Sequence, residues 1–235
     1  MLRKQFHILP PHDAGSNRAT PALCKRKFAQ YLEKGVTVID GRSALEFGKG
    51  FAKGAINIGI DGDFDTWIKV LIPINTPIVF IAPDGRELEM EERLHTLGYH
   101  QLLGFLPVKK LFQTSCTNAA CEQITIAMDF VDSCSPNDFE NYATIPGIVI
   151  LDIRESRELP YGKIPKSLWI PLREIPGRIH MFDEEKTYLI YCQSGYRSMI
   201  AASLLINEGI VNVINVVGGV ELIKQVKPEL LAEVY

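Results

Sequence analysis

Long hydrophobic runs and an excess of basic charge are both missing from this 235-residue sequence. No apolar run approaches the roughly 18 residues that a membrane-spanning helix needs. Lysine and arginine number 25 against 28 acidic residues, a net charge of −3, whereas nucleic-acid binding usually needs a clearly basic surface. The basic N-terminal residues are followed by only a very short apolar segment, which makes a poor signal peptide. We therefore expect a cytoplasmic protein with neither a membrane nor a nucleic acid as partner.

Cysteine is also scarce, with five residues in the chain. An odd number cannot form a complete disulfide framework, which fits a reducing compartment. Cys116, Cys121 and Cys134 lack zinc-site spacing and have no histidine nearby, so we expect no metal site, and no residue cluster implies a cofactor. A resolving cysteine that reaches Cys192 from this region stays an open alternative. Cys24 is expected to be a core residue in a short helix.

One pattern of residues occurs twice along the chain. Residues 36–58 (VTVIDGRSALEFGKGFAKGAINI) and 148–170 (IVILDIRESRELPYGKIPKSLWI) both contain an apolar strand ending in Asp-x-Arg, then a glutamate, a glycine and a second short strand. Such self-similarity indicates one structural unit used twice. The matched pairs are Asp40 and Asp152, Arg42 and Arg154, Glu46 and Glu158, and Gly50 and Gly162.

Both copies then continue as strand, glycine-containing loop, helix and strand. Short apolar runs followed by helical stretches predict parallel strands with right-handed crossovers, an α/β fold in which helices flank each open parallel sheet. We expect two domains, residues 1–115 (domain one) and 116–235 (domain two), joined by a polar linker. The expected elements are strands at 77–81, 100–104, 125–131, 188–191 and 211–217, helices at 22–33, 85–98 and 197–208, and a helix N-cap at Ser135.

The segment YCQSGYRS, residues 191–198, is the strongest candidate for a chemical site. Cys192 follows a buried strand and opens a loop in which Gly195 permits a sharp turn before a helix. Successive backbone N–H groups in such a turn can form an anion nest, and the helix N-terminus adds its positive end. Together with the cation of Arg197, these surroundings favour the reactive thiolate. We call residues 192–198 the thiol loop, and its candidate anion-binding residues are Gln193, Ser194, Gly195, Tyr196, Arg197 and Ser198.

Three residues of the second copy are expected to support this loop. Asp152, at a strand end, should bind backbone amides or pair with an arginine such as Arg154. Glu158 should either orient the thiol loop or pair with Arg197.

The first copy lacks the thiol. In the aligned segment IAPDGREL, residues 81–88, Ala82 stands in place of Cys192 and Glu87 in place of Arg197, while Asp84 adds another acid. Alanine has no nucleophilic side chain, so domain one should be catalytically inactive and should cover domain two, shape a cleft or dock a partner. Trp67 is a candidate for the cleft wall, although burial in the core is the favoured interpretation.

The Asp-x-Arg, Glu158, GKIP (residues 162–165) and CQSGYRS motifs resemble the rhodanese family of sulfurtransferases, as two tandem domains over nearly the whole chain. The resemblance implies that Cys192 takes sulfane sulfur from thiosulfate or a low-molecular-weight persulfide, and that a thiol or sulfite accepts it. The loop has four residues between Cys192 and Arg197, as in rhodaneses, and phosphatase-like relatives have one more. Lys163 and Lys166 depart from the usual family pattern, and we interpret them as solvated surface residues.

A narrower resemblance is to the two rhodanese domains of metallo-β-lactamase–rhodanese fusions of the persulfide dioxygenase type. Residues 54–73 (GAINIGIDGDFDTWIKVLIP), 192–205 (CQSGYRSMIAASLL) and 7–21 carry it. The five histidines form no His-x-His cluster, so dioxygenase activity is not implied. Four alternatives stay open: a non-catalytic persulfide-sensing or protein-docking module, a single-turnover carrier with a protein sulfur donor or acceptor, a partner of a persulfide dioxygenase, and a phosphatase-like enzyme, against which the short loop argues.

Overall fold

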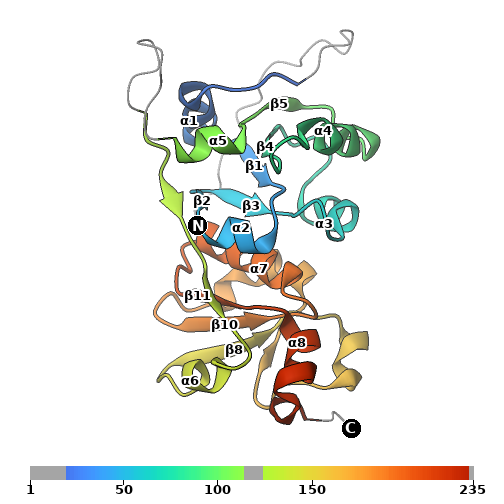
Figure 1. The fold of residues 1–235 in the computed structure, drawn as a ribbon, viewed down its shortest axis with the longest axis vertical. Coiled ribbons are helices and arrows are strands. Elements are labelled where there is room, and N and C mark those ends of the chain that lie inside the picture. Colours follow the sequence, from blue (N-terminus) through green and yellow to red (C-terminus); the bar gives the residue numbers. More distant parts are fainter. Residues whose placement is uncertain (1–19, 114–123, 233–235) are drawn as a thin grey trace.

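The computed structural model describes residues 20–113 and 124–232 as two α/β units stacked end to end (Figure 1). Cys116 and Cys121, which were considered above as possible resolving cysteines, lie outside these described residues. The elements of the first unit are α1 (Lys25–Glu33), β1 (Thr37–Asp40), α2 (Ala44–Gly48), β2 (Phe51–Ala52), β3 (Ala55–Asn57), α3 (Phe64–Leu71), β4 (Ile78–Ile81), α4 (Glu87–Thr96), β5 (Leu102–Phe105) and α5 (Val108–Phe112).

The second unit repeats this plan with two 3₁₀ helices in place of α2 and α3. Its elements, with the preceding strand β6, are β6 (Met128–Asp129), β7 (Asp132–Cys134), α6 (Phe139–Ala143), β8 (Ile148–Asp152), η2 (Ser156–Tyr161), β9 (Leu168–Trp169), η3 (Leu172–Met181), β10 (Thr187–Tyr191), α7 (Tyr196–Asn207), β11 (Val213–Val216), α8 (Gly219–Val226) and η4 (Pro228–Leu230).

The two sheets have the same strand order and are parallel throughout, as the repeat predicts. Domain one has the order β3-β1-β4-β5, and domain two has β9-β8-β10-β11 with β7 added beyond β11. In domain one the place of β7 is taken by a single parallel bridge between Ala22 and Phe105. This bridge is why α1 begins at Lys25, three residues later than the predicted start of the helix.

Each Asp-x-Arg motif forms a buried ion pair at the carboxyl end of a central strand. Arg42 Nη2 lies 2.6 Å from Asp40 Oδ2, and Arg154 Nη2 lies 2.7 Å from Asp152 Oδ2. All four side chains are almost fully buried. In each copy the arginine guanidinium also fixes the following loop. Arg42 donates a hydrogen bond to Gly50 O at 3.0 Å, and Arg154 donates one to Gly162 O at 2.8 Å.

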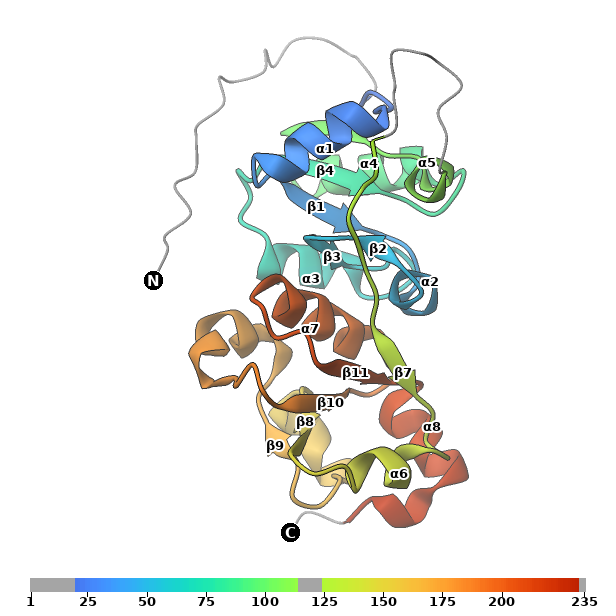
Figure 2. The same ribbon diagram turned by 90° about the vertical axis from the view of Figure 1, so that its left-hand side faces the viewer.

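Helix α7 lies in the seam between the two domains (Figure 2). One side packs on β10 and β11 of its own sheet, and another side packs on β3 of domain one. Apolar residues on all sides are typical of a fully buried helix, and the sequence YRSMIAASLLIN fits that position. Because of this helix, one hydrophobic core runs through both domains and contains residues such as Phe47 and Phe51 together with Met199 and Ile200.

The predicted opening strand at residues 125–131 is wrong. Its central part, β6, instead pairs antiparallel with β2 of domain one, and the strand that joins the domain-two sheet is β7. Alternating apolar residues specify a strand but not its partner. Residues 128–129 therefore pair with domain one although they lie beyond the expected boundary at residue 115.

The predicted helix N-cap at Ser135 is wrong in its position. The Ser135 Oγ atom accepts a hydrogen bond from the Asp138 amide at 3.3 Å, but α6 begins only at Phe139. Ser135 thus caps a turn that precedes the helix, which is a common alternative use of a serine side chain.

Candidate active site

Cys192 lies directly after β10, at the carboxyl edge of the domain-two sheet, and is fully buried. Its Sγ atom accepts a hydrogen bond from the Gly195 N–H at 3.1 Å and lies 3.5 Å from the Ser198 Oγ. Gly195 has φ +89°, a left-handed conformation that turns the chain back over the sulfur. The loop runs straight into α7, so the thiol lies at the positive end of that helix.

The carbonyl groups at the start of the thiol loop are held by the N-terminus of α8. Val220 N donates to Cys192 O at 2.9 Å, and Glu221 N donates to Gln193 O at 2.9 Å. A Cβ atom on Gly219 would lie 2.3 Å from Cys192 O, so no larger residue fits there without movement. No role was predicted for Gly219 from the sequence, although a pair of glycines after a buried strand could have indicated a close backbone contact.

Arg197 and Glu158 form a bidentate ion pair at the edge of the loop. Both nitrogen–oxygen distances are 2.6 Å, and the side chains are 13% and 20% exposed. Burial on its own raises the pKa of Glu158, but the hydrogen bonds from Arg197 and from the Glu155 amide, together with the charges of Arg197 and Arg154, outweigh it and hold that pKa below its usual value. Burial on its own lowers the pKa of Arg197, but the hydrogen bonds to Glu158 and the neighbouring negative charges together outweigh it and raise that pKa. Of the two roles expected for Glu158, the structure contains the pair with Arg197.

A buried tyrosine connects the Asp-x-Arg pair to the thiol loop. Tyr191, the residue before Cys192, donates its hydroxyl to Asp152 Oδ2 at 2.7 Å, and its ring lies beneath the Arg154 guanidinium. Burial, reinforced by the charge of Asp152, raises the Tyr191 pKa, so this hydroxyl stays protonated. Asp152 and Arg154 therefore act on the loop through Tyr191, a connection that the sequence analysis missed.

The remaining loop residues point in different directions. Ser194 is exposed, whereas Tyr196 turns toward domain one and donates its hydroxyl to Gly59 O at 2.9 Å. Gln193 Nε2 reaches Glu221 Oε1 at 3.4 Å. The structure therefore brings Gly195, Arg197 and Ser198 around the thiol and places Tyr196 at the domain seam.

The corresponding segment of domain one, residues 82–88, has the same turn without the chemistry, and we call it the silent loop. Gly85 has φ +81°, close to the value at Gly195, and Ala82 is fully buried. Asp84 in this loop is exposed, and its Oδ2 atom lies 2.9 Å from the Lys109 Nζ atom. Glu46, the counterpart of Glu158, forms the capping box of α2 with Ser43, as Glu158 does with Glu155 at η2.

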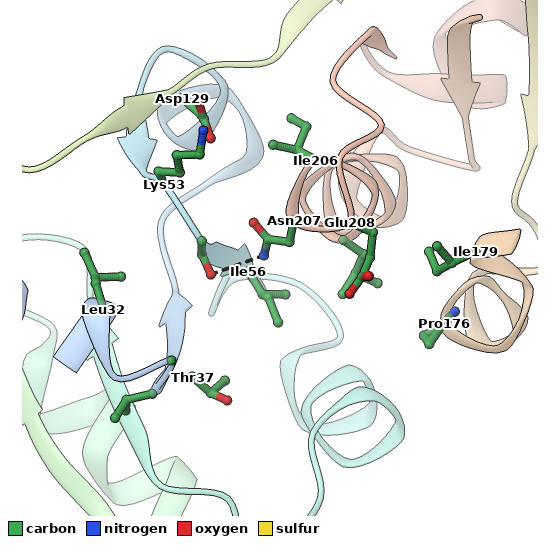
Figure 3. A pocket seen from close by; sticks show the side chains of 14 residues that line it. Leu32, Thr37, Lys53, Ile56, Asp129, Pro176, Ile179, Ile206, Asn207 and Glu208 are labelled. Atoms are coloured by element: carbon green, nitrogen blue, oxygen red, sulfur yellow. Dashed lines mark hydrogen bonds between the residues drawn. The ribbon is translucent and has the colours of Figure 1, made fainter. Parts of the chain in front are cut away.

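A separate groove of about 450 Å³ opens at the opposite end of the seam (Figure 3). Leu32 and Thr37 line one wall, Pro176 and Ile179 the other, and Asn207 lies between them. No thiol-loop residue contributes to its lining. The groove therefore does not provide access to Cys192.

Trp67 is 5% exposed and packs in the domain-one core, as favoured above, and it does not form a cleft wall. Among the described residues, no group of three or more His, Cys, Asp or Glu side chains is arranged to hold a metal ion. Within those same residues, no helix has the length and apolar character needed to cross a membrane.

The fold and the two loops define a class of protein: tandem parallel α/β domains with a buried thiol at a helix N-terminus in one copy only. A family model described as "Rhodanese-like domain" matches residues 25–107 and 127–225. The two matches cover most of the chain, which therefore belongs to the rhodanese-like family as a tandem of two domains.

Individual relatives match about one domain of this chain. A sulfurtransferase from Allochromatium vinosum is 33% identical over 81 residues, 34% of this chain and 76% of that protein. The putative sulfurtransferase YtwF from Bacillus subtilis is 35% identical over 72 residues, 31% of this chain and 69% of that protein. A solved rhodanese-related protein from Thermoplasma volcanium is 30% identical, with a TM-score of 0.39 over 44% of this chain and 99% of that one.

Proposed function

We propose that this protein is a sulfurtransferase in which Cys192 carries sulfane sulfur as a persulfide. The observation that carries the proposal is the hydrogen bond of 3.1 Å from the Gly195 N–H to the Cys192 Sγ at the start of α7. Backbone donors at a helix N-terminus stabilise a thiolate, the form of cysteine that attacks sulfur. The family and the named sulfurtransferase relatives point to the same chemistry.

The reaction has two steps, each a displacement at sulfur. With thiosulfate as donor, the Cys192 thiolate attacks the outer sulfur, the S–S bond breaks, and sulfite leaves with the bonding electron pair. With an organic persulfide, the leaving group is the corresponding thiolate. In the second step, a thiolate or sulfite attacks the outer sulfur of the Cys192 persulfide, and the Cys192 thiolate is released.

The loop residues have distinct roles in this proposal. The Gly195 N–H and the neighbouring loop amides stabilise the thiolate and then the persulfide anion. The Ser198 hydroxyl offers another donor at 3.5 Å from Sγ. Arg197 contributes positive charge beside the thiol, and Glu158 fixes the direction of its guanidinium.

The division of labour between the domains is part of the proposal. Residues 116–235 perform the transfer, and residues 1–115 form a catalytically inactive domain with Ala82 at the position of the nucleophile. We place the protein in the cytoplasm and in sulfide or persulfide metabolism. Its resemblance to the rhodanese domains of persulfide dioxygenase fusions suggests that it works beside such an enzyme. Small sulfur compounds are the proposed substrates, in line with thiosulfate sulfurtransferases among the relatives.

Intact mass spectrometry tests the proposal directly. Wild type and Cys192→Ser are incubated with thiosulfate and, separately, with glutathione persulfide. We expect wild type to gain one sulfur atom, about 32 Da, and Cys192→Ser to gain nothing. A matched control is Cys134→Ser, because Cys134 is also buried but its pKa is raised by burial to about 12. This variant should gain sulfur as wild type does.

The complete burial of Cys192 favours one rival function, a non-catalytic persulfide-sensing or docking module. A closed loop limits which donors reach the sulfur. If wild type gains no sulfur from either donor, the sulfurtransferase proposal is wrong and this rival replaces it. A gain from the persulfide alone would identify the donor as an organic persulfide.

A further inference from the structure

Tyr196 connects the thiol loop to the inactive domain. It lies between Gly195, whose N–H contacts the Cys192 sulfur, and Arg197, which pairs with Glu158. Its own side chain leaves domain two and donates a hydrogen bond to Gly59 O of domain one at 2.9 Å. Burial raises the pKa of Tyr196, so the hydroxyl remains a donor.

Two glycines of domain one make room for this ring. A Cβ atom on Gly62 would lie 2.4 Å from Tyr196 Cε2 and 2.6 Å from Cζ, well inside van der Waals contact. A Cβ atom on Gly59 would lie 3.3 Å from the same ring. Neither glycine has a left-handed φ, so backbone conformation does not explain the glycine at either position. At Gly62 the tyrosine ring leaves no room for a side chain, so glycine is the residue that fits there.

The contact belongs to a continuous line of bonds between α7 and domain one. Ser203 Oγ accepts from the Asn57 N–H at 3.1 Å, and Asn207 Nδ2 donates to Gly54 O at 3.2 Å. Tyr196, Ser203 and Asn207 recur on one face of the helix. They satisfy polar groups along the outer edge of β3, so the helix is fixed to domain one along its whole length.

The same domain-one segment also holds the helix that follows the silent loop. Arg86, the counterpart of Tyr196, donates to Asp61 Oδ1 at 2.6 Å. Asp61 lies between Gly59 and Gly62 in the chain. Residues 59–62 thus contact the starts of both α4 and α7. The contact at α4 is an ion pair with Arg86, and the contact at α7 is the hydrogen bond from Tyr196.

We propose that the inactive domain is a positioning element for the active thiol: Gly59 and Gly62 hold Tyr196, and Tyr196 holds the Gly195 N–H against the Cys192 sulfur. The inference rests on the proposed function for its kinetic readout only. The role that it assigns to domain one does not need a nucleophile in that domain. Tyr196 is a positioning residue, since it does not touch the reacting sulfur itself.

A double-mutant cycle on Gly62 and Tyr196 tests this proposal in the full chain. Gly62→Ala should displace the ring, move the Gly195 amide proton resonance upfield in ¹H–¹⁵N spectra as its hydrogen bond to the Cys192 sulfur weakens, and lower kcat for sulfur transfer by about tenfold with KM unchanged. Tyr196→Ala should have a similar effect. The double variant should match Tyr196→Ala, because Gly62→Ala acts only through the ring. Tyr196→Phe, which keeps the ring and loses the hydroxyl, should fall between wild type and Tyr196→Ala.

Gly177→Ala is the matched control, because a Cβ atom there meets nothing within 4 Å and its φ is not left-handed. It should match wild type in every readout. Additive effects of Gly62→Ala and Tyr196→Ala, or a wild-type Gly195 amide resonance and kcat in Gly62→Ala, would overturn the proposal. If no donor transfers sulfur to wild type, the proposed function fails, and the Gly195 amide resonances still decide the positioning role.

Discussion

The thiol loop and the silent loop have the same backbone and opposite chemistry. Both turn at a left-handed glycine, Gly195 at φ +89° and Gly85 at φ +81°, and both follow a central strand and precede a helix. The buried Asp-x-Arg pairs beside them agree within 0.1 Å, at 2.6 and 2.7 Å. Since the copy without the thiol keeps these features, they stabilise the fold and do not by themselves indicate activity.

The differences that bear on the chemistry concern a few side chains and one helix. The thiol and its cation are present only in domain two, and of the two matched acids Glu158 pairs with that cation whereas Glu46 caps α2. Helix α7 is buried between its own sheet and the neighbouring domain, whereas α4, its counterpart, buries only Met90, Glu91 and Leu94. The copy without the thiol therefore supplies a packing surface for the helix that begins at the thiol of the other copy.

The largest effect is expected from the feature that the two copies share. Arg42→Ala and Arg154→Ala each leave a buried aspartate without its partner, so each should lower the free energy of unfolding by about 3–5 kcal/mol. Urea denaturation followed by circular dichroism measures both. Arg173→Ala is the control, because its pair with Glu155 involves an arginine that is 60% exposed, and it should cost less than about 1 kcal/mol. If Arg42→Ala alone lowers the free energy of unfolding only slightly, the buried Asp-x-Arg pair does not stabilise the two copies equally.

Much of this fold could be predicted from the sequence because its signals are local. Buried parallel strands are short apolar runs, and Gly209, with φ +93°, marks the end of α7 where predicted. The position of Cys192 after a strand also placed it correctly at a helix N-terminus. The pair of Arg197 with Glu158 could be given only as one of two alternatives, because 39 residues separate the partners.

The remaining features depend on contacts between the domains, which no local pattern encodes. The pairing of β6 with β2 was missed because an alternating segment fits any free strand edge. The contact of Tyr196 with Gly59 and Gly62 was missed because each residue also has an ordinary local explanation as part of a loop. Gly219 was seen in the sequence, but its close approach to Cys192 O appears only in the folded chain.

The next largest effect separates the two loops by charge. Arg197→Ala removes the cation beside the thiol and leaves the Glu158 carboxylate facing it, so kcat/KM for sulfur transfer should fall by roughly 10²-fold. Glu87→Ala, the change at the matching position of domain one, should leave kcat/KM unaltered. Steady-state kinetics with both donors measures this. A decrease below about threefold for Arg197→Ala would remove the electrostatic part of the proposed mechanism.

A smaller effect is expected when the thiol is restored to domain one. Ala82→Cys, made in a Cys192→Ser background, should take up no sulfur, because Asp84 and Glu87 oppose a thiolate there. Adding Glu87→Arg should allow the uptake of one sulfur atom, about 32 Da, because a cation then replaces an acid beside the thiol. Intact mass after incubation with glutathione persulfide reports both variants. Uptake by Ala82→Cys alone would show that the charges of the silent loop do not keep it inactive.

The smallest expected effect is the acid sensitivity of the ion pair found only in domain two. Burial raises the pKa of Glu158, but the hydrogen bonds from Arg197 and the Glu155 amide, with the charges of Arg197 and Arg154, together lower it from 4.5, so Glu158 binds protons less readily in the folded than in the unfolded chain. It therefore contributes stability above about pH 4.5, and this contribution is lost as the pH falls below that value. Glu158→Gln should flatten the pH dependence of the free energy of unfolding between about pH 5 and 3 by less than about 1 kcal/mol. Arg197→Ala should abolish the same loss of stability, because the burial of Glu158 is then no longer offset by the pair, and Arg197→Ala added to Glu158→Gln should change the pH dependence no further. A curve for Glu158→Gln that runs parallel to wild type through this range would contradict the assignment of the lowered pKa to that pair.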